Sequence, residues 1–318
     1  MTPPTVPAVP SGRTARRLEW AHLPPALRGI IEQRCGSPVT RAISQRSGFT
    51  PGFASVLLCA DGTSHFVKAA SLKAQRGFAE AYREEARIAR ALPETVAATR
   101  LLWIHDADDW VALGFEYVDA RAPHRPWTDD DLAACLDTLA AIARTLTPVP
   151  PALALEDAEA DFADWPAKWE HTLATFALPF GEEAAALAAR FAEVVGGDSV
   201  VHGDVRDDNV LITGDGRVLL CDWNWPVRGA AWLDSLILLI GPRGDGLDVE
   251  QVLATHPTFA EVDAEAIDIV LALLIGYFLT HSDDPVPSSS PYIRDHQLWQ
   301  GEVLWEWLCE RRGWPENP

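Results

Sequence analysis

Alternating apolar and polar positions dominate the first third of the chain. Residues 39–70 alternate as strands do, and the segments SGFTPG and ADG interrupt them as turns. Residues 77–92 then space apolar side chains at helical intervals, and Pro93 closes that segment. Two further strand-like segments, RLLWIHD and WVALGFEYV, flank a turn at residues 107–109. The pattern predicts an antiparallel sheet with one helix packed against it.

Helical periodicity dominates the rest of the chain. It is clearest after Thr128, a capping residue that three acidic residues follow in the first turn. Only residues 199–225 interrupt this pattern with strand-like runs, and TGDG at residues 213–216 is typical of a hairpin turn. A second, mainly helical lobe is therefore expected, with its helices in residues 128–146, 156–195, 247–281 and 291–312.

The length of 318 residues suits two lobes, which we assign to residues 18–118 and 119–318. Residues 1–17 carry prolines where a signal peptide needs a continuous apolar stretch, so we expect an unfolded leader there. The apolar run at residues 266–281 starts with charge and is short for a bilayer, which favours a buried helix over a membrane span.

The net charge limits the classes of partner, and the cysteine content indicates the cellular compartment. Subtracting 46 acidic from 26 basic residues leaves a net charge of −20, which argues against nucleic acid and anionic membranes and favours a neutral or cationic partner. The acidic cluster at residues 156–164 fits an ordinary solvated face, with attraction of a cationic substrate as the alternative. The sequence leaves the oligomeric state open. Five scattered cysteines without a Cys-x-x-Cys pair indicate reduced thiols in a cytoplasm: Cys35, Cys59, Cys135, Cys221 and Cys309.

The segment SVVHGDVRDDNVLITGDGRVLLCDWNW at residues 199–225 places oxygen-bearing side chains at the ends of two predicted strands. If these strands pair across the TGDG turn, Asn209 and Asp222 come to the same end of the ribbon. Asp204 lies on the loop that leads to Asn209, so the three side chains can converge. Carboxylate and amide oxygens are ligands that Mg²⁺ prefers, and the segment predicts a magnesium–nucleotide site.

HGDVRDDN followed by LLCDW resembles the catalytic loop and metal-binding Asp of the aminoglycoside phosphotransferase family, the small-molecule branch of the protein-kinase-like fold. The resemblance covers about residues 39–312. It implies a two-lobed α+β fold, with a small antiparallel sheet and one helix in the N-lobe and a mainly helical C-lobe that carries a catalytic hairpin. It also implies that Asp204 is the base that orients the acceptor hydroxyl and that Asn209 and Asp222 are the magnesium ligands.

The same resemblance extends to the predicted sheet. Lys68 in HFVKA matches the strand lysine that holds the α- and β-phosphates, and Glu85 matches its helix partner, with Glu84 as the rival. SGFTPGF offers only Gly48 and Gly52 of a glycine-rich phosphate loop, and a plain turn explains this pattern almost as well.

FEYVDA matches the connector between the lobes. Its backbone at Glu116 and Val118 is expected to meet the adenine edge, with Phe115 limiting the depth of the pocket.

Two further residues near the catalytic loop are candidates. Arg206 stands where protein kinases carry a lysine against the transferring phosphate, which makes it a second candidate catalytic residue beside Asp204. A salt bridge of Arg206 to Asp207 or Asp208 explains it about as well. Asp234 matches the aspartate that braces the catalytic loop in the family.

The resemblance implies an enzyme that transfers the γ-phosphoryl group of ATP, or GTP, to a small-molecule hydroxyl with Mg²⁺. An antibiotic acceptor, hence resistance by phosphorylation, is one expectation, and kinases for choline, homoserine or sugars stay open because they look similar at these motifs. A protein kinase is disfavoured, because the path from Asp222 to Trp232 leaves little room for an activation segment. A pseudokinase is also disfavoured, because it would normally lack one of four residues that are all present here: Lys68, Asp204, Asn209 and Asp222.

Overall fold

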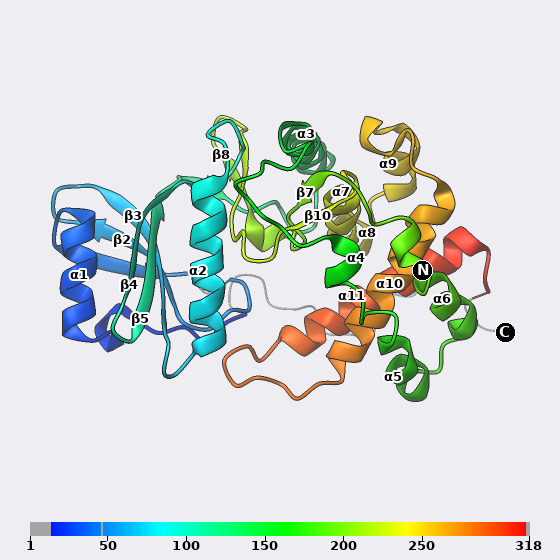
Figure 1. Cartoon of the computed structure of the whole chain (residues 1–318), viewed down its shortest axis with the longest axis horizontal. Coiled ribbons are helices and arrows are strands. Elements are labelled where there is room, and N and C mark those ends of the chain that lie inside the picture. The colour runs from blue at the N-terminus through cyan, green and yellow to red at the C-terminus, as the bar shows by residue number, and fades with distance from the viewer. Residues whose placement is uncertain (1–13, 46, 316–318) are drawn as a thin grey trace.

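The computed structural model describes residues 14–45 and 47–315, which fold into two lobes that lie side by side (Figure 1). The N-lobe contains an antiparallel sheet with the strand order β1-β2-β3-β5-β4. This confirms the predicted sheet, and the turn at residues 107–109 joins β4 to β5 as expected. The strands are β1 (Val39–Ser44), β2 (Phe53–Cys59), β3 (Ser64–Ser71), β4 (Leu101–Ala107) and β5 (Trp110–Glu116).

One helix covers each face of this sheet (Figure 1). The predicted helix is α2 (Arg76–Ala91), whereas α1 (Pro25–Cys35) on the opposite face was not predicted. Along β3, Val67 and Ala69 belong to the core under α1, while Ala70 belongs to the core under α2. Because side chains alternate along a strand, Lys68 projects from the α2 face.

The C-lobe is mainly helical, as predicted. Thr128 caps its first helix by accepting a hydrogen bond from the Asp131 backbone N–H at 3.3 Å. The α-helices are α3 (Asp129–Thr145), α4 (Ala158–Asp161), α5 (Lys168–Thr175), α6 (Gly181–Ala188), α7 (Leu233–Leu238), α8 (Ile240–Gly244), α9 (Val249–Thr255), α10 (Ala264–Ser282) and α11 (Ile293–Arg312). Short 3₁₀ helices are η1 (Trp20–His22), η2 (Phe191–Glu193), η3 (Asp207–Asn209) and η4 (Pro257–Phe259).

Five short strands lie among these helices. The predicted hairpin forms between β8 (Val210–Thr213) and β9 (Val218–Leu220). β6 (Ala120–Arg121) pairs with β8, and β10 (Val227–Gly229) pairs with β7 (Ser199–Val201). The sequence analysis missed β6 and β10, because such short strands leave no periodicity.

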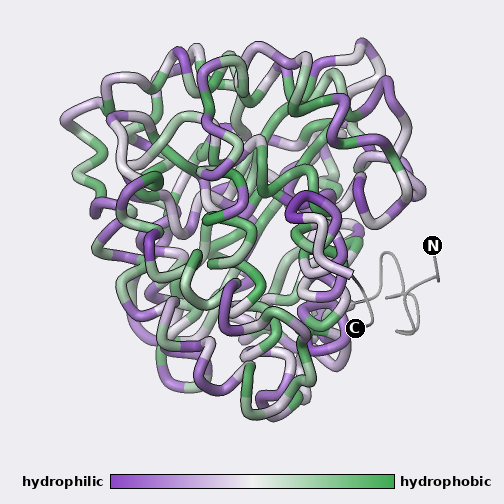
Figure 2. Tube along the Cα trace, turned by 90° about the vertical axis from the view of Figure 1, so that its right-hand side faces the viewer, coloured by the Kyte–Doolittle hydropathy of each residue, from purple (hydrophilic) through white to green (hydrophobic). Residues whose placement is uncertain are grey.

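The most apolar helix of the C-lobe is α10, which packs mainly against α11. Among the described residues it is the one helix with the length and composition to cross a membrane, but 67% of its most apolar window is buried inside the protein. This agrees with the predicted buried helix. Figure 2, seen from the C-lobe end, shows hydrophobic segments toward the middle and hydrophilic ones toward the rim.

The end of the predicted leader is packed against both lobes. Residues 1–13 lie outside the described residues, but Thr14 and Ala15 are buried. The Thr14 hydroxyl donates to the Gly48 carbonyl at 2.6 Å, and the Arg16 backbone N–H donates to the Ser289 carbonyl at 2.8 Å. Residues 14–17 therefore differ from the predicted unfolded leader, because they connect the loop between β1 and β2 with the loop before α11.

Candidate active site

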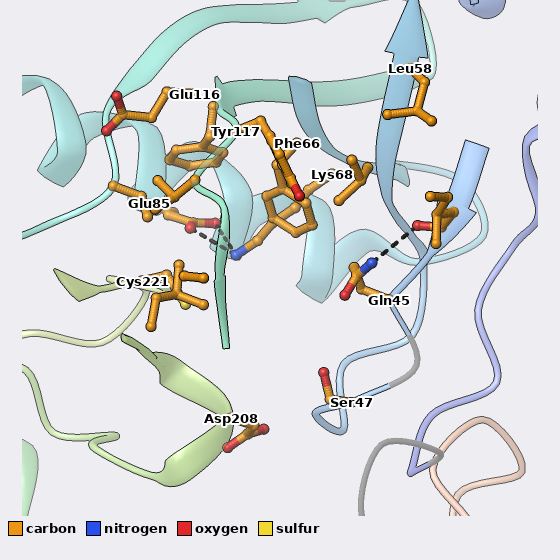
Figure 3. Close-up of a pocket in the computed structure, with 17 residues that line it drawn as sticks. Gln45, Ser47, Leu58, Phe66, Lys68, Glu85, Glu116, Tyr117, Asp208 and Cys221 are labelled. Atoms are coloured by element: carbon orange, nitrogen blue, oxygen red, sulfur yellow. Dashed lines mark hydrogen bonds and ion pairs between the residues drawn. The ribbon is translucent and has the colours of Figure 1, made fainter. Parts of the chain in front are cut away.

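A cavity with a volume of about 390 Å³ lies between the lobes (Figure 3). The N-lobe sheet forms one wall, and residues around the β8–β9 hairpin form the other. Its apolar lining comprises Ile43, Val56, Leu58, Phe66, Phe115, Val118, Ala120, Leu211 and Cys221, and its polar lining includes Gln45, Ser47, Lys68, Glu85, Thr99, Glu116, Tyr117 and Asp208.

Lys68 binds carboxylates of both lobes. Its Nζ donates to the Glu85 Oε1 and Oε2 atoms at 2.8 and 3.0 Å and to Asp222 Oδ1 at 2.7 Å. Burial alone lowers the pKa of Lys68, but Asp222 and Glu85 outweigh it and raise that pKa, so the ammonium stays charged. Glu84 instead pairs with Arg87 at 2.9 Å, which leaves Glu85 as the partner of Lys68.

The loop between β7 and β8 carries Asp204, Arg206 and Asn209. Arg206 Nη1 donates to Asp204 Oδ1 at 2.6 Å, and Asn209 Nδ2 donates to Asp204 Oδ2 at 3.0 Å. Arg206 also forms two hydrogen bonds to Asp208, at 3.0 and 3.2 Å, as the salt-bridge alternative anticipated. Burial raises the pKa of Asp204, and the Arg206 guanidinium opposes that shift.

Asp234 holds this loop in shape, as its sequence position suggested. Its two carboxylate oxygens accept hydrogen bonds from the backbone N–H groups of His202 at 2.7 Å and Gly203 at 3.0 Å. Gly203 has a φ of 79°, and a Cβ there would lie 3.2 Å from the Trp225 carbonyl oxygen. The sharp turn before Asp204 therefore depends on glycine.

The predicted metal ligands meet at a smaller cavity of about 70 Å³, which Asn209, Asp222 and Lys68 all line. The Asn209 amide nitrogen is engaged with Asp204, so the amide oxygen is the atom that can bind a cation. Burial raises the pKa of Asp222, but the Lys68 ammonium outweighs it and holds that pKa below its usual range, so the carboxylate is ionised. This oxygen donor set fits Mg²⁺.

The two glycines of the β1–β2 loop differ in position. Gly48, at a φ of 79°, lines the smaller cavity. Gly52, at a φ of 116°, lines neither cavity, and a Cβ there would lie 3.0 Å from the Ala69 carbonyl oxygen. Its own carbonyl accepts a hydrogen bond from the Leu18 N–H at 2.9 Å. Gly52 thus makes a close backbone approach at the start of β2, and its expected nucleotide contact stays a prediction.

Arg17 is a residue of this site that the sequence analysis missed. Its Nη2 donates to the Ser47 carbonyl at 2.9 Å, and its side chain lines the smaller cavity with Lys68 and Asp222. Its Nε is buried and has no hydrogen-bond partner among the described residues. No motif marks Arg17, because only the course of residues 14–18 across the β1–β2 loop brings it there.

The connector after β5 forms one end of the larger cavity. The Glu116 N–H donates to the Arg100 carbonyl at 3.0 Å, and Glu116 Oε1 accepts from the Arg100 N–H at 3.0 Å. The Glu116 backbone N–H is therefore occupied, and the Glu116 carbonyl is the backbone group that can accept a hydrogen bond from a ligand. Figure 3 shows the Glu116 carboxylate pointing away from Lys68. Phe115 is buried, with its ring centre 5.7 Å from the Lys68 Nζ.

Aromatic side chains gather on the C-lobe side of Asp204. Trp165 stacks on Tyr277 with ring centres 4.2 Å apart, and Phe162 lies 4.3 Å from Trp165. Burial and the nearby charge of Asp204 raise the pKa of Tyr277. The Lys168 Nζ already lies 5.8 Å from the Tyr277 ring centre. The sequence analysis did not single out Trp165, because nothing local distinguishes it from the other tryptophans of the chain.

Comparison with known proteins gives a family and a fold. Residues 57–264 match the sequence model of the phosphotransferase enzyme family. No curated protein matches the sequence as a whole. Among solved structures, choline kinase LicA from Streptococcus pneumoniae aligns at a TM-score of 0.57 and 14% identity, over 91% of this chain and 99% of its own.

Two further structures align over most of their length. A choline/ethanolamine kinase family protein from Mesorhizobium loti gives a TM-score of 0.55 and 15% identity, over 90% of this chain and 96% of its own. LicA in complex with AMP gives a TM-score of 0.57 and 12% identity, over 90% of this chain and 99% of its own. At such identities these matches establish the two-lobed kinase-like fold.

Proposed function

The chain belongs to the phosphotransferase enzyme family, and on that premise we propose that it transfers the γ-phosphoryl group of ATP or GTP to a hydroxyl group of a small molecule. One observation carries the proposal. Asp204, Asn209, Asp222 and Lys68 converge where the cavities between the lobes meet the catalytic loop. Such a site catalyses phosphoryl transfer mostly by positioning and by neutralising charge.

The larger cavity takes the nucleoside and the smaller one its phosphates. Lys68, oriented by Glu85, binds phosphate oxygens, and Arg17 adds a second cation at the same cavity. Asn209 and Asp222 would hold Mg²⁺, which would neutralise charge on the phosphates. Lys68 and Asp222 contact each other directly, and each would exchange that contact for its own ligand, phosphate or metal.

Asp204 acts on the acceptor. It accepts the proton of the hydroxyl group as the acceptor oxygen forms its bond to the γ-phosphorus, and the bond from that phosphorus to the bridging oxygen breaks to leave a nucleoside diphosphate. Arg206 positions Asp204 and keeps its carboxylate ionised. The free cysteines of the chain suit a cytoplasmic enzyme.

The acceptor that this surface favours is a small alcohol with a positively charged nitrogen. The Trp165 and Tyr277 rings form an aromatic wall of the kind that attracts cations, and Asp161 adds negative charge beside Tyr277. Both an aminoglycoside antibiotic and an amino alcohol such as choline have this chemistry. The similarity in fold to choline kinases supports the amino alcohol, whereas an antibiotic acceptor makes the enzyme a resistance factor.

The test is a screen for nucleoside diphosphate release with ATP and with GTP, followed by mass spectrometry of each product. The cationic arms are choline-like alcohols, aminoglycosides and macrolides with a protonated amino sugar, homoserine is a zwitterionic arm, and simple sugars are the neutral arm. We expect turnover with a cationic arm that Asp204→Asn abolishes. Turnover confined to neutral acceptors would overturn the acceptor assignment, and phosphorylation of none of these alcohols by a folded enzyme that binds nucleotide would contradict small-molecule transfer.

A further inference from the structure

A second group of chemistry-bearing side chains lies on the sheet face opposite the nucleotide cavity. Cys35 is the last residue of α1, Cys59 is the last residue of β2, and His65 is the second residue of β3. One ligand atom from each lies within 4.8 Å of the others. Both cysteines are buried, whereas the neighbouring turn at residues 61–63 is exposed, which leaves a path from solvent.

Hydrogen bonds fix the protonation of His65. Its Nε2 lies 3.3 Å from Thr63 Oγ1, and the Thr63 hydroxyl donates its only proton to Asp61 Oδ1 at 2.7 Å. Thr63 therefore accepts from His65, so Nε2 carries the proton and Nδ1 carries a lone pair. Nδ1 is buried and has no hydrogen-bond partner among the described residues, an arrangement that is unfavourable unless a ligand occupies the lone pair.

The surroundings of this lone pair favour a cation. The Asp61 and Glu32 carboxylates place negative charge near the Cys35 thiol. A bound cation would offset that charge and favour the thiolate form of its ligands. The chain from His65 through Thr63 to Asp61 resembles the outer hydrogen bonds that orient metal-binding histidines.

We propose that Cys35, Cys59 and His65 bind one thiophilic divalent cation, Zn²⁺ by chemistry, through two thiolates and Nδ1, with water as the fourth ligand. Binding forms two metal–sulfur bonds and one metal–nitrogen bond and releases one proton from each thiol. Tetrahedral zinc spaces such ligands roughly 3.5–3.8 Å apart, so the side chains approach one another by about 1 Å. The site links α1 to the β2–β3 turn and takes no part in phosphoryl transfer.

The experiment uses the full chain, reduced and stripped of metal with a chelator, and Co²⁺ as the probe. We expect one Co²⁺ per chain with a thiolate-to-cobalt absorption band, release of two protons, displacement of Co²⁺ by Zn²⁺, and a higher melting temperature with metal. Cys35→Ser, Cys59→Ser and His65→Ala should each lose the band, while Cys135→Ala, which removes a buried thiol of the C-lobe, should keep it.

A milder variant keeps the test decisive if a cysteine variant fails to fold. Thr63→Val leaves the three ligands in place but removes the hydroxyl that links His65 to Asp61, and it should weaken cobalt binding roughly 10- to 100-fold. Absence of a stoichiometric band in the reduced protein, or a band that survives in His65→Ala, would overturn the proposal. A stable Cys35–Cys59 disulfide that forms without any uptake of metal would also overturn it.

Discussion

Lys68 on β3 donates a 2.7 Å hydrogen bond to Asp222 Oδ1 across 154 positions of sequence, and this contact joins the two lobes at the smaller cavity. The same Nζ donates a second hydrogen bond, at 2.8 Å, to Glu85 Oε1 in the N-lobe. Lys68 therefore has a partner in each lobe. If either carboxylate is removed, the other still balances the charge of the Lys68 ammonium.

The first prediction concerns Asp222. Asp222→Asn should reduce phosphoryl transfer at least about 100-fold, because it removes the charged metal ligand. Asparagine suits the left-handed backbone at φ 68°, which alanine would strain. The variant should stay folded by circular dichroism, since Glu85 still pairs with Lys68. Wild-type rates in this variant, or in wild-type enzyme with excess chelator, would contradict the metal assignment.

The second prediction concerns Asp204. Asp204→Asn should slow single-turnover transfer about 10²–10⁴-fold while nucleotide affinity changes little, because an amide cannot accept the acceptor proton. The new amide NH₂ must also face either Arg206 or Asn209, both of which now donate to this side chain. Titration of nucleotide binding beside the transfer rate is the measurement. Lost affinity with an unchanged rate would make Asp204 a metal or structural residue instead.

The third prediction is a pH dependence. Asp204 acts when ionised, and burial raises its pKa above the ordinary 3.8, so kcat/KM should fall as the pH drops through that raised pKa. Arg206 opposes the shift, so Arg206→Gln should move the acidic limb to higher pH. Arg217→Gln, in the exposed hairpin turn, is the control and should leave the limb in place. An unmoved limb in Arg206→Gln would exclude its effect on Asp204.

The fourth prediction concerns Arg17. Arg17→Ala should weaken ATP binding about 10- to 100-fold, since a charge-assisted hydrogen bond contributes roughly 1.5–3 kcal/mol. Affinity for AMP should change much less, because the smaller cavity takes the outer phosphates. Arg16→Ala is the control, since Arg16 contacts the C-lobe through its backbone and its side chain is exposed. Calorimetric titration measures both affinities, and equal losses for ATP and AMP would make Arg17 a structural residue.

The fifth prediction concerns the acceptor wall. Asp161→Asn should raise the KM for a cationic acceptor roughly 3- to 10-fold and leave the KM for nucleotide unchanged, because it removes local negative charge. Glu182→Gln, exposed on α6, changes the net charge equally and serves as the control. Steady-state kinetics with each variant measure the effect. Equal effects of the two substitutions would indicate general charge rather than a local contact.

The sequence by itself determined the elements with strong local patterns. Period-two alternation over 39–70 and helical spacing over 77–92 recur as β1 to β3 and α2. Asn209 and Asp222 could be paired in advance because a hairpin fixes which residues share its end. Lys68 and Glu85 came from the family resemblance, and the structure places them in contact.

Tertiary structure alone decided the features whose residues are far apart and carry no local pattern. Arg17 lines the smaller cavity only because residues 14–17 cross the β1–β2 loop. The backbone hydrogen bond from Leu18 to Gly52 belongs to the same crossing. Cys35, Cys59 and His65 follow no metal-binding spacing and meet because α1 packs on β2 and β3. Sequence periodicity reports which face of an element is buried, whereas such encounters depend on how the elements pack against one another.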